Sequence, residues 1–196
     1  MNQTAASSTT VAIIRDCLHP ERGFTLAEML VAMALAATLT SLVAPSVAEY
    51  VESMQLSTAS SNLMASLHLA RYEAIKRNGR VVLCKTSDGT HCADSGGWEQ
   101  GWMVFHDVNN NSLREETEPI IQHQIALSGS LRMTGNTPVS RYISYGSMGG
   151  AQLVSGAFQA GTLTVCRALA SGDARQIIVN AAGRPRMQKA TLQECE

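Results

Sequence analysis

Positive charge is concentrated near the carboxyl end of a chain that is almost neutral as a whole. The 196 residues include 15 Lys and Arg against 16 Asp and Glu, which gives a net charge of −1. Between Ser130 and Ala190, seven basic residues face the single acid Asp173, so this segment carries +6. The basic residues are Arg132, Arg141, Arg167, Arg175, Arg184, Arg186 and Lys189. This distribution excludes a uniformly basic, histone-like protein, but it indicates a local surface for a polyanion.

The run Gly183-Arg184-Pro185-Arg186 is the most specific pattern in this segment. Guanidinium groups match phosphate oxygens, and the fixed φ of Pro185 stiffens the spacing between the two arginines. We predict that Arg184 and Arg186 are the main phosphate contacts. Three further side chains are predicted to support them: Lys189, Arg175 and Arg141. The alternative is a hairpin turn whose arginines are only solvated, and the sequence leaves it open.

The rest of the sequence also indicates how a polyanion would be bound. The sequence shows no base-reading helix and no cluster of stacking aromatic residues, and only 5% of the residues are aromatic. Contacts to phosphates alone carry no sequence information and weaken as salt rises. We therefore expect weak, sequence-independent binding, on the order of micromolar or weaker.

The loop 107–118 contains a second pattern, which could bind a cation. Oxygen-bearing side chains occupy positions 1, 3, 5, 9 and 12 of an EF-hand-like spacing: Asp107, Asn109, Asn111, Glu115 and Glu118. Position 6 is Ser112 instead of glycine, and the flanking runs are typical of strands rather than helices. Asn-rich turns also arise because Asn side chains bond to their own backbone. Calcium binding stays open, and we expect no other metal and no cofactor.

Catalytic chemistry is not indicated by the sequence. The five His residues lie apart along the chain, and no nucleophile–base pair or catalytic carboxylate pair is evident. We therefore expect a protein that is not an enzyme.

The elements that must position these residues are mostly strands. From Arg80 onward, β-rich runs alternate with Gly- and Asn-rich turns. The predicted strands cover residues 80–85, 101–106, 119–125, 141–145, 162–167 and 175–180. No motif is evident in 127–161. We predict one small antiparallel β domain over residues 79–196.

A long helix is predicted before the β domain. Residues 24–44 contain one charge, Glu28, and no Gly or Pro, and the run is long enough to cross a membrane. Pro45 follows and should kink or locally melt the helix. Apolar residues then form one stripe of a 3.6-residue helix: Leu56, Leu63, Leu67, Ala70 and Ala74. With a stop at Asn78-Gly79, we predict a helix over 24–78, membrane-spanning over 24–44 and packed on the β domain beyond, in an α+β fold.

Residues 21–28, Glu-Arg-Gly-Phe-Thr-Leu-Ala-Glu, resemble the processing site of type IV prepilins and type II secretion pseudopilins. In that family a prepilin peptidase cuts after the Gly and methylates the new N-terminal Phe. The resemblance implies that residues 1–23 are a leader removed between Gly23 and Phe24. It also implies a type IV pilin-like fold, and a subunit that sits in the inner membrane by a single pass with a periplasmic head before it joins the tip of an extracellular pilus.

The same resemblance assigns roles in assembly to two residues. In the family's filaments, the Glu at the position of Glu28 neutralises the N-terminal amine of an adjacent subunit. Related pilins also carry a Pro at the position of Pro45, which fits a helix that loosens when it packs in a filament. We therefore expect Glu28 and Pro45 to serve assembly.

Two stretches and the arginine pattern narrow the resemblance to the GspH/FimT-like minor pilins. Residues 67–78 resemble the end of their helix, and residues 98–107 resemble the strand that follows. The run 183–186 matches the Gly-Arg-x-Arg pattern with which DNA-uptake minor pilins of the FimT type contact DNA. The resemblance implies a minor pilin that binds extracellular double-stranded DNA non-specifically for natural transformation. The alternative is a priming or tip subunit of a pilus, or a type II secretion pseudopilin, that does not bind DNA. In both cases other pilins of the filament tip are expected partners.

The cysteine count is consistent with export. Cys17 lies in the leader implied by the resemblance, so four cysteines would remain. An even number of cysteines outside the cytoplasm indicates two disulfides. Four cysteines can pair in three ways. We favour the arrangement in which both bonds are local in sequence, Cys84–Cys92 and Cys166–Cys195. A metal site is the less favoured reading, because the sequence contains no Cys-x-x-Cys pair.

Overall fold

The computed structural model describes residues 23–168 and 171–195, without the side chains at 42–46 and 48–49. The leader expected at residues 1–23, including Cys17, therefore lies almost entirely outside the described residues. The chain divides at Pro45 into two units, residues 1–45 and 46–196, and each is described by itself. We call the second unit the head.

The predicted long helix is present as α1 (Leu26–Arg77). Its first turn is closed by Thr25 and Glu28: the Thr25 N–H and hydroxyl donate to the Glu28 carboxylate, and the Glu28 N–H donates to the Thr25 hydroxyl. This is a capping box, which satisfies backbone groups that a helix leaves unpaired at its start. The prediction for Pro45 was a kink or local melting. The helix continues through this residue, so melting is not observed, and a kink stays a prediction.

The helix ends where the sequence predicted. Asn78 adopts a positive φ of 50°, and the Gly79 N–H donates to the carbonyl of Ala74 at 3.1 Å. A left-handed residue followed by such a bond terminates an α-helix and turns the chain away.

The membrane span predicted for residues 24–44 includes side chains at 42–44 that lie outside the described part of the chain. Among the helical residues that the structure describes, no stretch is both long enough and apolar enough to cross a membrane.

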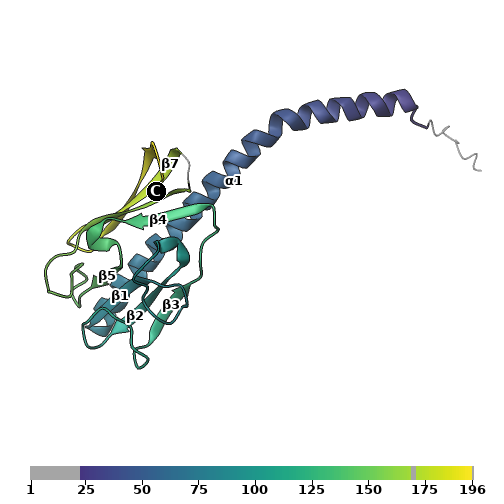
Figure 1. Cartoon of the computed structure of the whole chain (residues 1–196). Helices are drawn as coiled ribbons and strands as arrows, with labels where there is room; N and C mark the ends of the chain where they lie inside the picture. Colours follow the sequence, from purple (N-terminus) through teal and green to yellow (C-terminus); the bar gives the residue numbers. More distant parts are fainter. Residues whose placement is uncertain (1–22, 169–170, 196) are drawn as a thin grey trace, which may run out of the picture. The chain divides into compact units, whose positions relative to one another are not determined.

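The head contains two antiparallel four-stranded sheets (Figure 1). The first has the order β3-β2-β1-β5, with β1 (Arg80–Lys85), β2 (Trp102–Asp107), β3 (Ile120–Gln124) and β5 (Tyr142–Tyr145). The second has the order β4-β6-β7-β8, with β4 (Leu131–Gly135), β6 (Gly161–Arg167), β7 (Gly172–Val179) and β8 (Pro185–Leu192). Two short 3-10 helices, Trp98–Gln100 and Thr137–Val139, lie in the connections.

The core of the head forms between the later part of α1 and both sheets. The predicted stripe is confirmed, because Leu56, Leu63, Leu67, Ala70 and Ala74 are all at most 2% exposed and belong to one cluster with residues of both sheets. Trp102 of β2 is fully buried in this cluster, and its Nε1–H donates to the Ser66 hydroxyl of α1 at 2.9 Å. Burial of this apolar surface is the main force that holds helix and sheets together, and the α+β fold class is confirmed.

The six predicted strands correspond to β1, β2, β3, β5, β6 and β7, within three residues at each end. Two strands were not predicted: β4 lies in the segment without motifs, and β8 includes Arg186, which had been placed in a turn. Both favoured disulfides are present, Cys84–Cys92 and Cys166–Cys195. The second joins β6 to the end of the chain just beyond β8.

Candidate nucleic-acid interface

The turn that carries Arg184 connects β7 to β8 and is held by Asn180. The Gly183 N–H donates to the Asn180 carbonyl at 2.8 Å, and the Arg184 N–H donates to the Asn180 Oδ1 at 3.0 Å. Asn favours such turns because its side chain can bond to nearby backbone N–H groups. The backbone at Arg184 is therefore fixed while its side chain remains exposed.

Gly183 packs this turn tightly against the loop after β5. Its φ is +72°, a conformation that glycine adopts without the steric cost of a Cβ. A Cβ at this position would overlap the carbonyl oxygen of Gly149 and approach the Ala151 nitrogen to 3.1 Å. Ala151 also donates its N–H to the Ala181 carbonyl at 3.2 Å, so the loop and the turn form one unit.

Arg71 of α1 supports the contact between Gly183 and the loop after β5. Its role was not predicted from the sequence. Its Nε donates to the Gly149 carbonyl at 2.9 Å, the same oxygen against which Gly183 packs. Arg71 thus ties the turn to α1 through the loop. The sequence gives no direct signal for this role, because the helical pattern indicates only a polar residue at this position.

We expect Gly183→Ala to lower the free energy of unfolding by about 2–3 kcal/mol, because it adds the cost of a positive φ to an overlap with backbone. Chemical denaturation of the full chain measures this change. Gly156→Ala is the matched control: Gly156 has a φ of +83° but open space around its Cβ, so only the conformational cost of about 1 kcal/mol applies. Equal losses in the two variants would show that the contact with Gly149 does not matter.

The basic residues of β7 and β8 lie on opposite faces of the second sheet. Arg175 pairs with Lys189 across the two strands, in register with Ile177 and Met187. Because Ile177 is buried in the core cluster, Arg175 and Lys189 share the face that points toward α1. Arg186 has the opposite parity and lies on the outer face. The structure therefore does not gather all predicted phosphate contacts on one surface.

Arg141 is also separate from Arg184 and Arg186. It precedes β5 of the first sheet, and its guanidinium forms an ion pair with Asp94. Arg175 is 7% exposed, so it is not available on the outer surface. Of the predicted site, Arg184 and Arg186 are exposed and close in sequence, and the buried Gly183 holds the turn just before them.

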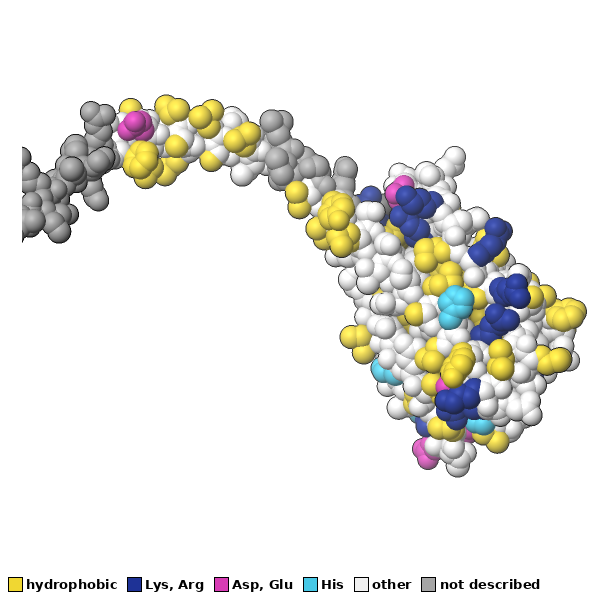
Figure 2. Space-filling view, turned by 180° about the vertical axis from the view of Figure 1, so that it is seen from behind, with side chains coloured by type: hydrophobic (Ala, Val, Ile, Leu, Met, Phe, Trp, Pro, Cys, Tyr) yellow, Lys and Arg dark blue, Asp and Glu magenta, His cyan; other side chains and the backbone are white. Residues whose placement is uncertain are grey.

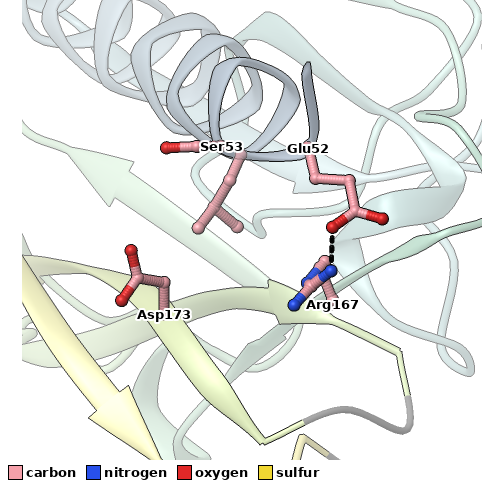
Figure 3. Close-up of a pocket in the computed structure, with 5 residues that line it drawn as sticks. Glu52, Ser53, Arg167 and Asp173 are labelled. Carbon is pink, nitrogen blue, oxygen red and sulfur yellow. Dashed lines mark hydrogen bonds and ion pairs between the residues drawn. The ribbon is translucent and has the colours of Figure 1, made fainter. Parts of the chain in front are cut away.

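Acids from other parts of the chain neutralise further bases of the +6 segment. Arg132 pairs with Glu99 at 3.3 Å, and Arg167 pairs with Glu52 of α1. Figure 3 shows this second pair in a pocket of about 260 Å³, with the Asp173 carboxylate on β7 pointing toward the helix and away from Arg167. The charge that remains available is therefore smaller than the sequence suggests.

Three basic side chains in the described residues have neither an ion pair nor a side-chain hydrogen bond there: Arg184, Arg186 and Lys189. The other ten described Lys and Arg side chains each have at least one partner. All three lie in the turn before β8 or on β8 itself. Figure 2 shows one face of the head on which Lys and Arg recur from end to end while acids are few. The unpaired positive charge of the described head thus lies on β8 and in the turn before it.

The loop 107–118 is closed by its own hydrogen bonds. The buried Asp107 carboxylate accepts hydrogen bonds from the backbone N–H groups of Asn111 and Ser112 at 3.1 and 2.9 Å. The Glu115 carboxylate accepts hydrogen bonds from the side-chain amides of Asn109 and Asn111. Burial raises the pKa of the Asp107 carboxyl, and the Ser112 N–H opposes that rise. Ser112 takes a positive φ of 59°, as the glycine at position 6 of an EF-hand would.

This loop was one of two candidates for a metal in the sequence, and the four cysteines of the other form the two disulfides. Within residues 23–168 and 171–195, no three His, Cys, Asp or Glu side chains come together in an arrangement suited to a metal ion. The loop connects β2 to β3 through a turn held by its own hydrogen bonds, and calcium binding by it stays a prediction from the sequence.

Two protein families match the sequence. The family described as type II transport protein GspH matches residues 59–183, which is more than half of the chain. The prokaryotic N-terminal methylation motif matches residues 18–44, which contain the predicted cleavage site. No curated protein matches the chain closely enough to count as a relative.

Two crystal structures of the type IV minor pilin FimU from Pseudomonas aeruginosa share the fold. The first is 17% identical, covers 75% of this chain and 99% of FimU, and has a TM-score of 0.57. The second is also 17% identical, covers 72% of this chain and all of FimU, and has a TM-score of 0.55. At this identity the likeness concerns the fold alone.

Proposed function

Because the chain belongs to the type II transport protein GspH family and is a minor pilin or pseudopilin, we propose that its head captures extracellular double-stranded DNA for natural transformation. Arg184 and Arg186 are the phosphate contacts of this proposal. The observation that carries it is that the described head leaves its unpaired cations in the turn 180–184 and on β8, while it pairs or bonds the others.

The geometry of residues 184–186, which we call the arm, suits a phosphate backbone. Arg184 immediately precedes β8 and Arg186 is the second residue of that strand, so two exposed guanidinium groups lie close together at this end of the sheet. Unpaired guanidinium groups lose no internal bond when they bind a phosphate, and each can form two parallel hydrogen bonds. Neither residue enters a groove-reading helix, so the contact recognises charge rather than sequence.

The arm is also held in place before it binds. Asn180 and Gly183 fix one end of β8, and the Cys166–Cys195 disulfide closes the chain beyond its other end. A preorganised contact pays less conformational entropy on binding. Once a pilus tip has caught DNA in this way, retraction of the filament by cytoplasmic motors would draw the DNA toward the cell.

The proposal is tested by the double variant Arg184→Gln/Arg186→Gln. We expect it to weaken binding of a random-sequence duplex at low salt at least about tenfold, and to lower the slope of log K against log salt by about 2, because two phosphate contacts are lost. A salt-titrated gel-shift or fluorescence anisotropy assay on the full chain measures both quantities. Pilus assembly should remain intact.

Arg132→Gln/Arg141→Gln is the matched control, because it removes the same charge from two exposed arginines that already pair with acids. We expect DNA affinity to stay within about twofold for this variant. Equal losses in the two double variants would reduce the effect to net charge. Full DNA binding by Arg184→Gln/Arg186→Gln would refute the assignment of the phosphate contacts to these two residues. No DNA binding by the unchanged chain would leave a structural subunit of a pilus or secretion pseudopilus as the function.

A further inference from the structure

A groove separates α1 from the last two strands of the head, on the face opposite to Arg186. It has a volume of about 460 Å³. Its lining residues are Ser53, Met54 and Ser57 of α1, Arg175 of β7, and Met187, Gln188 and Lys189 of β8. All of them belong to the head, so the groove does not depend on how the two units of the chain are arranged.

Arg175 is the unusual member of this lining. It is 7% exposed, yet its one side-chain hydrogen bond within the described residues goes from Nη1 to the neighbouring Ala174 carbonyl, at 3.1 Å. A guanidinium has five N–H donors, and no Arg175 nitrogen is among the fully buried atoms without a partner, so its remaining donors are reached from the groove. They are available to an anion that enters the groove, where a guanidinium can form charge-assisted hydrogen bonds.

The acids around Arg175 do not supply this anion. Asp173 lies two residues earlier on the same face of β7, but it lines the neighbouring pocket, where its carboxylate points toward α1 (Figure 3). Within the described residues, Asp173 and Arg175 form no ion pair. Glu52, which also lines that pocket, is taken by Arg167. The nearest charged neighbour in register is instead a second cation, Lys189.

Two cations that are in register with each other have two hydroxyls across the groove from them. Together these four groups form a receptor for a compact oxyanion. Lys189 is exposed and has no side-chain partner among the described residues, and the Ser53 and Ser57 hydroxyls lie one helical turn apart on α1. Planar guanidinium and compact ammonium groups both bind phosphate oxygens strongly, and hydroxyls can satisfy the oxygens that remain. Met54, Met187 and Gln188 complete the lining.

We propose that this groove binds a phosphate group, held between Arg175 and Lys189. The site is distinct from the contacts of Arg184 and Arg186 and does not rest on the DNA-binding proposal. Two sources share this chemistry, free inorganic phosphate and the terminal 5′-phosphate of a nucleic-acid strand, and the experiment below separates them.

The test is calorimetric titration of the full chain with inorganic phosphate in a low-salt chloride buffer. We expect saturable binding that weakens about tenfold in Lys189→Gln, because one charge-assisted contact is lost. Arg175→Lys, which keeps the charge but loses the planar fork, should also weaken binding, and its unfolding curve shows whether the fold is preserved. Arg132→Gln removes one exposed charge elsewhere on the second sheet and should leave phosphate affinity unchanged.

Short single strands with and without a 5′-phosphate identify the source. Tighter binding of the phosphorylated strand, relieved by inorganic phosphate and retained in Arg184→Gln/Arg186→Gln, supports the proposal with a strand end as ligand. Equal binding of the two strands together with saturable inorganic phosphate supports it with the free ion as ligand. The absence of saturable phosphate binding would overturn the proposal, and it is the result expected if another subunit occupies the groove. Equal losses of phosphate affinity in Lys189→Gln and Arg132→Gln would also overturn it.

Discussion

Replacing Trp102 by alanine should lower the free energy of unfolding by about 3–5 kcal/mol. Trp102 is fully buried and lies where β2 meets α1 in the main core cluster. Its removal leaves a cavity in a close-packed interior and frees the Ser66 hydroxyl from its indole partner. Chemical denaturation, followed by far-UV circular dichroism of the full chain, measures the loss.

Trp102→Phe separates the two contributions. Phenylalanine keeps most of the aromatic volume but cannot donate to Ser66, so we expect a smaller loss of about 1–2 kcal/mol. If Trp102→Ala costs no more than Trp102→Phe, the packing of α1 on the first sheet contributes less than the buried area implies.

Removing the Cys166–Cys195 disulfide, by changing both residues to alanine, should cost about 3–4 kcal/mol. The crosslink closes a loop with a sequence separation of 29, so its absence gives the unfolded chain much more conformational freedom. The bond also lies in a small buried cluster with Ala174, next to Ala190 and Leu192 of β8. Denaturation of the oxidised protein and of the double variant gives the difference.

The Cys84–Cys92 disulfide is the matched comparison within the same head. Its sequence separation is 8, so loop closure predicts a smaller cost of about 2.5 kcal/mol for its removal. A larger loss for this short loop than for the long one would contradict the loop-closure account. In addition, removal of Cys166–Cys195 but not of Cys84–Cys92 should weaken DNA binding, because only the former restrains the end of β8.

The helix and most strands could be predicted because their sequence patterns are local. The stripe from Leu56 to Ala74 repeats with the period of a helix, and β1 is an unbroken buried run. By contrast, β8 begins with proline and has polar or charged residues on both faces, so it shows no alternation. An edge strand that is mostly exposed leaves little hydrophobic signal in its sequence.

The basic surface could be predicted only in part because charge pairing depends on the fold. Net charge over residues 130–190 counts neither Glu52, Asp94 nor Glu99, which the fold brings to Arg167, Arg141 and Arg132. Strand parity then places Arg175 and Lys189 on the face toward α1. Arg184 and Arg186 remained exposed because they lie in a turn and at the start of an edge strand.

The capping box at the start of α1 has a consequence for maturation. Every atom in it belongs to Thr25 or Glu28, both of which follow the predicted cut after Gly23. Loss of the first 23 residues would therefore leave these capping bonds in place. A peptidase could trim this end of the chain without unwinding what comes after it.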